Sequence, residues 1–180
     1  MQNLDHALSA ELNQRQLDHL YRKRNSHDGP QRPQLKINGQ TLLAFCSNDY
    51  LGLANHPALI RAAQNACVDY GLGSGASHLV AGHTDVHHEL EEALAKLTQR
   101  PRALLFSSGY MANMGVLSSL LDRQDAVYQD RLNHASLLDG GLLSAAKFQR
   151  YRHQDLSDLQ RQLDKTQARR HLVATDAVFS

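Results

Sequence analysis

Residues 105–113 read Leu-Phe-Ser-Ser-Gly-Tyr-Met-Ala-Asn. A short apolar run rich in β-forming residues stops at Ser107-Ser108-Gly109, and a stretch with few helix breakers follows. This pattern predicts a strand, a tight turn and a helix. The first N–H groups of such a helix have no partner within it, and the positive end of the helix dipole lies behind them. The turn is therefore a natural binding site for a phosphate group.

A second polar segment follows one strand–helix unit later. Residues 130–136, Asp-Arg-Leu-Asn-His-Ala-Ser, come directly after the short apolar run 125–128. A phosphate site beside a histidine at the end of the next strand suggests a phosphorylated cofactor.

The composition is that of a folded globular protein. The 180 residues are 42% hydrophobic and 21% charged, which is enough chain to bury a substantial core. The formal net charge is only +1, and the arginines near the C-terminus are too scattered to form a basic stripe. Nothing in the charge pattern therefore indicates a nucleic-acid partner.

The cysteines and the N-terminal sequence indicate the cellular compartment in which the protein is expected. Cys46 and Cys67 match no metal or redox spacing, and so few cysteines fit a reducing compartment. The N-terminus lacks the basic-then-apolar order of a signal peptide, and no apolar run approaches the roughly 20 residues that a membrane span needs. We therefore expect a cytoplasmic protein with no membrane partner.

Strand-like and helical segments alternate regularly from residue 103 onward. This order is typical of an α/β fold with a mainly parallel sheet covered by helices on both faces, a three-layer αβα arrangement. Ligands on such sheets bind beyond the carboxyl ends of the strands, where 107–109, 130–134 and 175–180 should lie. The predicted strands are near 103–107, 126–129, 147–151 and 171–175, and the helices between them are 110–122, 135–145 and 156–167.

The N-terminal region carries simpler elements. Leucines spaced three to five apart predict an amphipathic helix over 4–24, which would end in a basic cluster. Asn38-Gly39 lies between two β-prone runs and predicts a hairpin over 36–41. A further helix is expected to begin at 55–57 and to end at Gly71.

These elements suggest two parts. Residues 1–45 form a helix and hairpin segment, and residues 46–180 form the first part of a larger domain. A parallel sheet would not normally leave its last strand and the polar loop after it as a free end. We therefore expect the chain to be the front of a longer protein.

The glycine-rich stretch 71–76 fits the loose dinucleotide pattern G-x-G-x-x-A. That fingerprint must follow a strand and open a helix. Here a helical segment precedes it, and the next helix, capped by Thr84, begins about eight residues later. We interpret the stretch as a mobile loop near a site or a subunit boundary.

His83, His87 and His88 raise the question of a metal site, because His83 and His87 are four residues apart. No Glu follows His83 as in His-Glu-x-x-His, and Cys and carboxylate ligands do not cluster there. Polar residues at a helix start are the favoured interpretation, so no metal is expected.

Other polar residues have two interpretations. His134 is either a functional residue or a strand-end residue that caps the next helix. Asp176 and Ser180 could be turn formers, as could 48–50. Without a family resemblance, the sequence predicts a phosphate site with polar neighbours and nothing more specific.

Residues 46–53, Cys-Ser-Asn-Asp-Tyr-Leu-Gly-Leu, followed by Asn-His-Pro at 55–57, closely resemble the opening signature of the α-oxoamine synthases. These are pyridoxal-phosphate enzymes that condense an amino acid with an acyl thioester. The resemblance covers nearly all of the chain in the right order, and it implies the fold-type I, aspartate-aminotransferase-like large domain. The further motifs are at 71–75, 87–91, 108–113, 133–136 and 178–180.

The resemblance also implies roles at the cofactor. Ser108, Gly109 and Tyr110 would hold the phosphate of pyridoxal 5′-phosphate, in agreement with the helix-start argument. His134 would stack on the pyridine ring as the catalytic histidine.

The remaining implied roles surround the ring and the substrates. Asp176, where many relatives have Glu, and Ser180 would belong to the hydrogen-bond set around the ring. Asn48 would contact the carboxylate of the amino acid, and Arg22 would contact the acyl substrate.

The implied reaction is the decarboxylative condensation of L-alanine with pimeloyl-CoA or pimeloyl-ACP in biotin biosynthesis, carried out by a homodimer. The motifs at 47–53 and 108–110 favour this over 2-amino-3-ketobutyrate CoA ligase, which is the alternative within the family. A non-catalytic truncated module for dimerisation or cofactor binding is the alternative outside it.

The lysine that attaches the cofactor in such enzymes has no counterpart here. None of the five lysines lies in the Thr/Ser-rich context that the family uses. Without that lysine there is no tether for the cofactor and no obvious base for the alanine Cα proton. We expect the 180-residue chain to be inactive alone.

Overall fold

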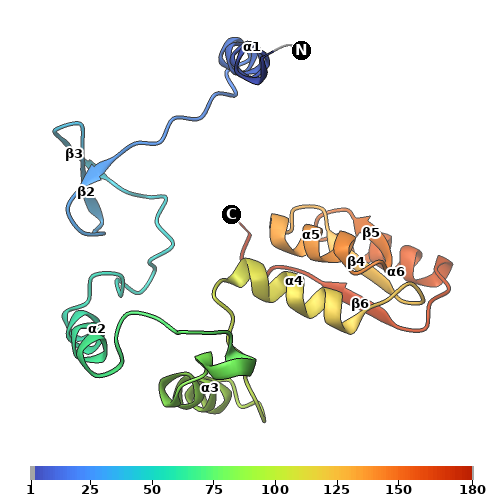
Figure 1. Cartoon of the computed structure of the whole chain (residues 1–180). Helices are drawn as coiled ribbons and strands as arrows, with labels where there is room; N and C mark the ends of the chain where they lie inside the picture. The colour runs from blue at the N-terminus through green and yellow to red at the C-terminus, as the bar shows by residue number, and fades with distance from the viewer. Residues whose placement is uncertain (1–2, 180) are drawn as a thin grey trace. The chain divides into compact units, whose positions relative to one another are not determined.

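The computed structural model describes residues 3–179 and divides the chain into two compact units, Met1–Gly73 and Ser74–Ser180 (Figure 1). Each unit is described by itself. These units are defined by contacts between residues. The predicted boundary between residues 45 and 46 instead separates the cofactor-binding domain from the segment before it, and it stays a prediction. None of the helices in residues 3–179 is both long enough and apolar enough to cross a membrane.

Helix α1 (Leu4–Leu17) is shorter than the helix predicted over 4–24. His19 has a φ of +57°, and the N–H of Leu20 bonds back to the Arg15 carbonyl oxygen at 2.8 Å. This is a Schellman turn, in which a residue in the left-handed region ends the helix. The prediction that the helix continued to its basic cluster was wrong, and that cluster lies in the irregular segment beyond the turn.

The predicted hairpin is confirmed. Strands β2 (Gln34–Ile37) and β3 (Gln40–Leu43) pair antiparallel, with Ile37 opposite Gln40. Asn38 and Gly39 form the two-residue loop with φ values of +50° and +81°, as a type I′ turn requires. A short strand β1 (His27–Asp28) adds to the free edge of β2.

Helix α2 (Pro57–Tyr70) begins and ends where it was predicted. The His56 ring accepts a hydrogen bond from the Ala58 N–H at 3.2 Å, and Pro57 takes the first helical position. Gly71 ends the helix with a φ of +78°. The glycine-rich stretch therefore follows a helix, which is not the context of a dinucleotide fingerprint.

The second unit begins with the π-helical turn η1 (His78–Gly82) and helix α3 (Asp85–Leu97). Thr84 precedes α3, and its N–H donates to the His87 Nδ1 at 3.2 Å. The predicted start of this helix is confirmed, with a histidine in the place that Glu or Gln usually takes in a capping box.

The strand predicted near 103–107 is not found. Residues 102–106 have no regular secondary structure, and no strand pairs with them among the described residues. Their one hydrogen bond to α3 is from the Leu105 N–H to the Glu91 carboxylate, at 3.0 Å. A β-prone run becomes a strand only where another strand accepts its hydrogen bonds, so this prediction was wrong for the described chain.

The other three predicted strands form a parallel sheet in the order β5-β4-β6. They are β4 (Ala126–Asp130), β5 (Lys147–Tyr151) and β6 (His171–Ala174), and Ala126 lies opposite both Lys147 and His171. All five residues of β4 are buried, as expected for a central strand with helices on both faces.

Helices cover the sheet on both sides, which confirms the three-layer arrangement. Val127 packs with α4 (Gly109–Leu120) and α5 (Ala135–Leu143), whereas its neighbours Ala126 and Tyr128 pack with α6 (Leu156–Lys165). The alternation of side chains along β4 thus separates the two cores. The first core contains Leu117, Leu121, Val127 and Leu137, and the second contains Ala126, Tyr128 and Tyr151.

The order of connections positions the site. The chain passes from β4 through α5 outward to β5, and then through α6 back across β4 to β6. Because right-handed crossovers in opposite directions place their helices on opposite faces, α5 and α6 lie on different sides. The direction changes between β4 and β6, so the crevice at their carboxyl ends is the topological switch point, where ligands bind in open α/β sheets.

The amino-terminal edge of the sheet is held by an ion pair. Asp125 is fully buried, and its carboxylate accepts hydrogen bonds from Arg169 Nε at 3.0 Å and Nη2 at 2.8 Å. These bonds lower the pKa of Asp125 although burial opposes the change. The pair stabilises the fold at the edge away from the switch point.

Candidate active site

Asn133 joins the carboxyl ends of β4 and β6. Its Nδ2 donates to the Ala174 carbonyl oxygen at 2.8 Å, and its Oδ1 accepts from the Asp176 N–H at 3.1 Å. The side chain is 6% exposed, so both of its amide atoms are satisfied in a nearly dry position. Asn133 therefore sets the spacing of the two loops at the switch point.

Asp176 reaches across the same crevice to His134. The His134 N–H donates to Asp176 Oδ2 at 2.6 Å. Together with the bonds of Asn133, this contact brings two of the predicted site residues, 42 positions apart, into one cluster. The second carboxylate oxygen of Asp176 has no partner among the described residues, so it is available to a ligand.

The ring of His134 is oriented by a chain of side-chain hydrogen bonds. Asn113 Nδ2 donates to Ser136 Oγ at 2.9 Å, and Ser136 Oγ lies 2.7 Å from His134 Nδ1. Since Ser136 Oγ accepts from the Asn113 amide, its own hydrogen is free to be donated to Nδ1. The Ser136 N–H also lies 3.2 Å from Nδ1, so His134 caps α5 as well. The cap interpretation of His134 is confirmed, and because its ring is exposed the functional interpretation stays a prediction.

The start of α4 matches the predicted anion site. Ser108 is its N-cap and accepts from the Met111 N–H at 3.2 Å. The N–H groups of Gly109 and Tyr110 have no acceptor among the described residues, as expected at a helix start. A Cβ placed on Gly109 would meet nothing within 4 Å, so a ligand can approach this backbone closely.

Tyr110 links α4 to α5 and to the histidine. Its hydroxyl donates to the Asp139 carboxylate, and this bond raises the pKa of Tyr110 above its ordinary value. Its ring meets the edge of His134 at a centroid distance of 6.1 Å and an interplanar angle of 77°. The helix start and the switch-point loop are therefore in direct contact.

Asp130 fixes the loop that carries His134. It is the last residue of β4, and it accepts hydrogen bonds from Leu132 N–H at 2.8 Å, Gln154 N–H at 3.0 Å and His153 Nδ1 at 3.0 Å. Burial raises the pKa of Asp130, but these three donors outweigh burial, and the net pKa is lowered. The carboxylate therefore acts as a buried anchor.

The other predicted site residues are not among the described residues of the second unit. Ser180 is outside the described residues. Arg22 and Asn48 belong to the first unit, where both are exposed. Asn48 directly precedes a turn that the Asp49 carboxylate closes by accepting the Leu53 N–H at 2.8 Å.

Sequence reasoning did not assign the supporting residues. Asn113, Asn133 and Ser136 were named only as members of the motifs at 108–113 and 133–136, and Asp139 was given no role. Ser136 is indeed a local partner of His134, but the bonds of Asn133 to β6 and of Asp139 to Tyr110 join distant parts of the chain. Their positions could have indicated a role, because Asn133 lies three residues after β4 and both Ser136 and Asp139 lie on α5, the helix that follows.

Known proteins match most of the chain. The family model for aminotransferase class I and II matches residues 40–180. The chain is 60% identical to 8-amino-7-oxononanoate synthase of Cellvibrio japonicus over 99% of its length, and 62% identical to that of Nitrosomonas europaea over 96%. It spans 45% of the length of each of these relatives.

Solved structures show the same similarity. Sphingomonas wittichii serine palmitoyltransferase superposes with a TM-score of 0.86 at 30% identity, over 97% of this chain and 44% of that one. Francisella tularensis 8-amino-7-oxononanoate synthase gives a TM-score of 0.64 at 38% identity, over 75% of this chain and 37% of that one. The S. paucimobilis serine palmitoyltransferase whose structure contains PLP bound to myriocin gives 0.89 at 28% identity, over 99% of this chain and 46% of that one. With the family model matched over most of its length, the chain belongs to the aminotransferase class I and II family.

Proposed function

We propose that this chain is part of a pyridoxal-phosphate-dependent acyltransferase that condenses L-alanine with a pimeloyl thioester, releases CO2 and forms 8-amino-7-oxononanoate for biotin synthesis. The observation that carries the proposal is the cluster of His134, Asp176 and Tyr110 at the switch point, beside an open helix start. Relatives at about 60% identity bear the name of this enzyme, which supports the choice of substrate.

The described residues fit pyridoxal phosphate. The open N–H groups of Gly109 and Tyr110 would bind its phosphate, and the Ser108 hydroxyl, which accepts from Met111, can still donate its own hydrogen. The exposed ring of His134 would lie against the pyridine, with Nδ1 held by Ser136. Asp176, and Ser180 beyond the described residues, would complete the hydrogen bonds around the ring.

The cofactor supplies an electron sink for the carbanion that forms at the amino-acid Cα. The protein residues provide position: the bond from His134 N–H to Asp176, and the Asn133 bonds to the same loop, hold the two sides of the crevice at a fixed spacing. Asn48 would bind the carboxylate of alanine and Arg22 the acyl thioester.

The lysines of the described second unit do not join the cluster. Lys147 donates through Nζ to the Gln167 carbonyl oxygen, at the opposite end of β5 from the crevice. We therefore propose that the isolated 180-residue chain does not decarboxylate alanine. We further propose that the active form is a cytoplasmic homodimer, an inference supported by the family resemblance and, for the reducing compartment, by two cysteines that are free and exposed.

The test uses the complete gene product. Product formation is measured by mass spectrometry with L-alanine and either pimeloyl-CoA or pimeloyl-ACP, and with glycine plus acetyl-CoA and serine plus palmitoyl-CoA as competing pairs. We expect turnover with alanine and a pimeloyl thioester. Preference for glycine with acetyl-CoA would instead support 2-amino-3-ketobutyrate CoA ligase, and no turnover with any pair would support the non-catalytic alternative.

A matched pair of variants tests the site. His134→Ala should lower kcat at least about 100-fold, because the ring that faces the cofactor is lost. The exposed His6 of α1 serves as the control, and His6→Gln should retain the activity of the wild type. Equal activities of the two variants would contradict the role of His134.

A further inference from the structure

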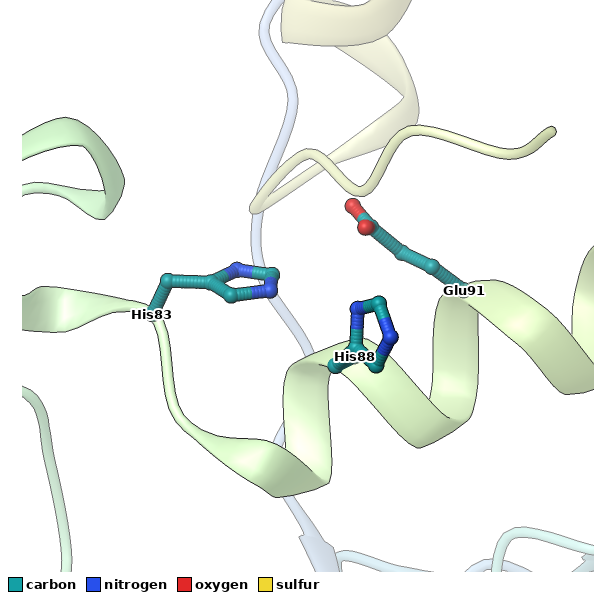
Figure 2. Close-up of side chains that lie close together, drawn as sticks. All are labelled: His83, His88 and Glu91. Carbon is teal, nitrogen blue, oxygen red and sulfur yellow. The ribbon is translucent and has the colours of Figure 1, made fainter.

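Two histidines and a glutamate of the second unit converge beside α3. His83, His88 and Glu91 each offer one ligand atom, and these atoms lie within 4.8 Å of one another. Figure 2 shows the two rings and the carboxylate directed toward a common space. None of these residues belongs to the cluster at His134.

The backbone positions two of the three ligands. His88 and Glu91 are three residues apart on α3 and so lie on one face of the helix. His83 comes from the loop just before the helix, next to the capping residue Thr84. His87 is not in this cluster; its Nδ1 caps α3 instead, 3.2 Å from the Thr84 backbone nitrogen and 2.8 Å from the Thr84 hydroxyl. The four-residue spacing that first suggested a metal site therefore pairs the wrong histidine.

Each candidate ligand has a partner for its other polar atom. His83 Nδ1 lies 3.0 Å from His78 Nδ1, so the two rings share a hydrogen and His83 keeps Nε2 open. His88 Nε2 lies 3.3 Å from Glu92 Oε1, the carboxylate–histidine pairing that orients metal-binding imidazoles.

The glutamate is fixed in the same way. Glu91 Oε1 accepts the Leu105 N–H at 3.0 Å, which leaves Oε2 open. No lysine or arginine of residues 3–179 forms an ion pair with Glu91, although it is half-buried. The open Oε2 of Glu91 is therefore available to a cation.

From this geometry we propose that His83, His88 and Glu91 bind one Zn²⁺ ion. Two imidazoles and one carboxylate form a known zinc ligand set, which leaves a fourth position for water. Zinc–ligand distances of about 2.0–2.2 Å require the donor atoms to approach to roughly 3.3 Å. His83 and His88 are exposed and can close this gap by rotation, while α3 and the bond to Leu105 hold Glu91 in place.

The test is metal binding by the full-length chain, first freed of metal with a chelator. Co²⁺ serves as the spectroscopic probe, and Zn²⁺ affinity is measured by competition with a chromophoric chelator. We expect one Co²⁺ per chain with the intense visible bands of a tetrahedral site, and displacement by one Zn²⁺. His83→Gln, His88→Gln and Glu91→Gln should each weaken Zn²⁺ binding at least about tenfold.

Glu89→Gln is the matched control, because it removes the same charge from an exposed position on the same helix and should change the affinity less than about twofold. Glu91→Gln keeps an oxygen that can accept the Leu105 N–H, so far-UV circular dichroism should not change. The proposal is overturned by the absence of saturable binding, or by binding that the three ligand variants retain. Neither result bears on the acyltransferase proposal, because the assay involves no turnover.

Discussion

Replacing Asn133 with alanine removes a side chain that bonds the carboxyl ends of β4 and β6 to each other through both of its polar atoms. Nδ2 loses the Ala174 carbonyl oxygen at 2.8 Å, and Oδ1 loses the Asp176 N–H at 3.1 Å. The remaining contact between the loops is the bond from His134 N–H to Asp176.

The expected cost follows from those two bonds. A hydrogen bond contributes about 0.5–1.5 kcal/mol net, so Asn133→Ala should lower the free energy of unfolding by about 1–3 kcal/mol. Asn133→Asp should cost more at neutral pH, because the new carboxylate faces the Ala174 carbonyl oxygen and can no longer donate to it. Protonation restores a donor, so that variant should recover part of the loss in mild acid.

Urea unfolding followed by far-UV circular dichroism measures the effect. With m values of about 1–3 kcal/mol/M, the Asn133→Ala midpoint should fall by about 1 M. Gln167→Ala is the control, because it also truncates an amide in the second unit but at an exposed position, and it should change stability by less than about 0.5 kcal/mol. If both variants unfold at the same midpoint, Asn133 does not join the two strand ends in solution.

Three further outcomes are expected. Gly141→Ala should destabilise the second unit by about 1–3 kcal/mol in the same urea assay, because a Cβ there would lie 2.6 Å from Gln129 Nε2 and 2.7 Å from the Phe148 ring, whereas Gly75→Ala, in the same unit and with nothing within 4 Å, should not. Asp125 has a lowered pKa in the folded state, so its charge stabilises the fold at pH values above its pKa in the unfolded chain, about 3.9. This contribution is lost as the pH falls through the pKa of the folded state. Asp125→Asn should therefore flatten the decline of the thermal midpoint between about pH 5 and pH 2, and an unchanged slope would contradict the ion pair. In a spectrophotometric titration near 295 nm, Tyr110→Phe should remove a tyrosine that ionises above the ordinary pH range, and loss of a normally titrating tyrosine instead would contradict the Asp139 bond.

Local sequence patterns predicted most of the helices, strands and turns, because residues close in sequence determine where these elements begin and end. The Asn38-Gly39 turn, the His56 cap of α2 and the Gly71 stop each depend on the backbone preferences of one or two residues. The regular strand–helix alternation also predicted β4, β5 and β6 and the helices between them, because the crossover rules leave few other arrangements.

The errors have physical causes beyond the local pattern. The helix predicted over 4–24 overran His19, because histidine carries no strong signal for a positive φ. The run at 103–107 has the residues of a strand, but strand pairing depends on a partner elsewhere in the chain.

The site residues likewise include some that the sequence predicted and others that depend on tertiary packing. The phosphate-binding turn at Ser108 and Gly109 and the strand-end position of His134 were predicted from the sequence, because they follow from the order of elements. The contact of Asp176 with His134 was implied only by family resemblance to a common cofactor, and the bonds of Asn133 and Asp139 depend on tertiary packing that no spacing encodes. The metal ligand pairing of His83 with His88 likewise depends on a loop geometry that the sequence does not specify.

The arrangement of β4 at the centre of the sheet also has a consequence for folding during synthesis. Within residues 3–179, the strand partners of β4 and the helices of its two cores all come from one continuous stretch, residues 109–174. Roughly 20 residues separate the paired positions Ala126 and Lys147, so little loop-closure entropy opposes the first pairing. Low contact order favours fast assembly. The β4–β5 pair should therefore form soon after it leaves the ribosome, and the crevice that holds His134 would then close as soon as β6 docks beside it.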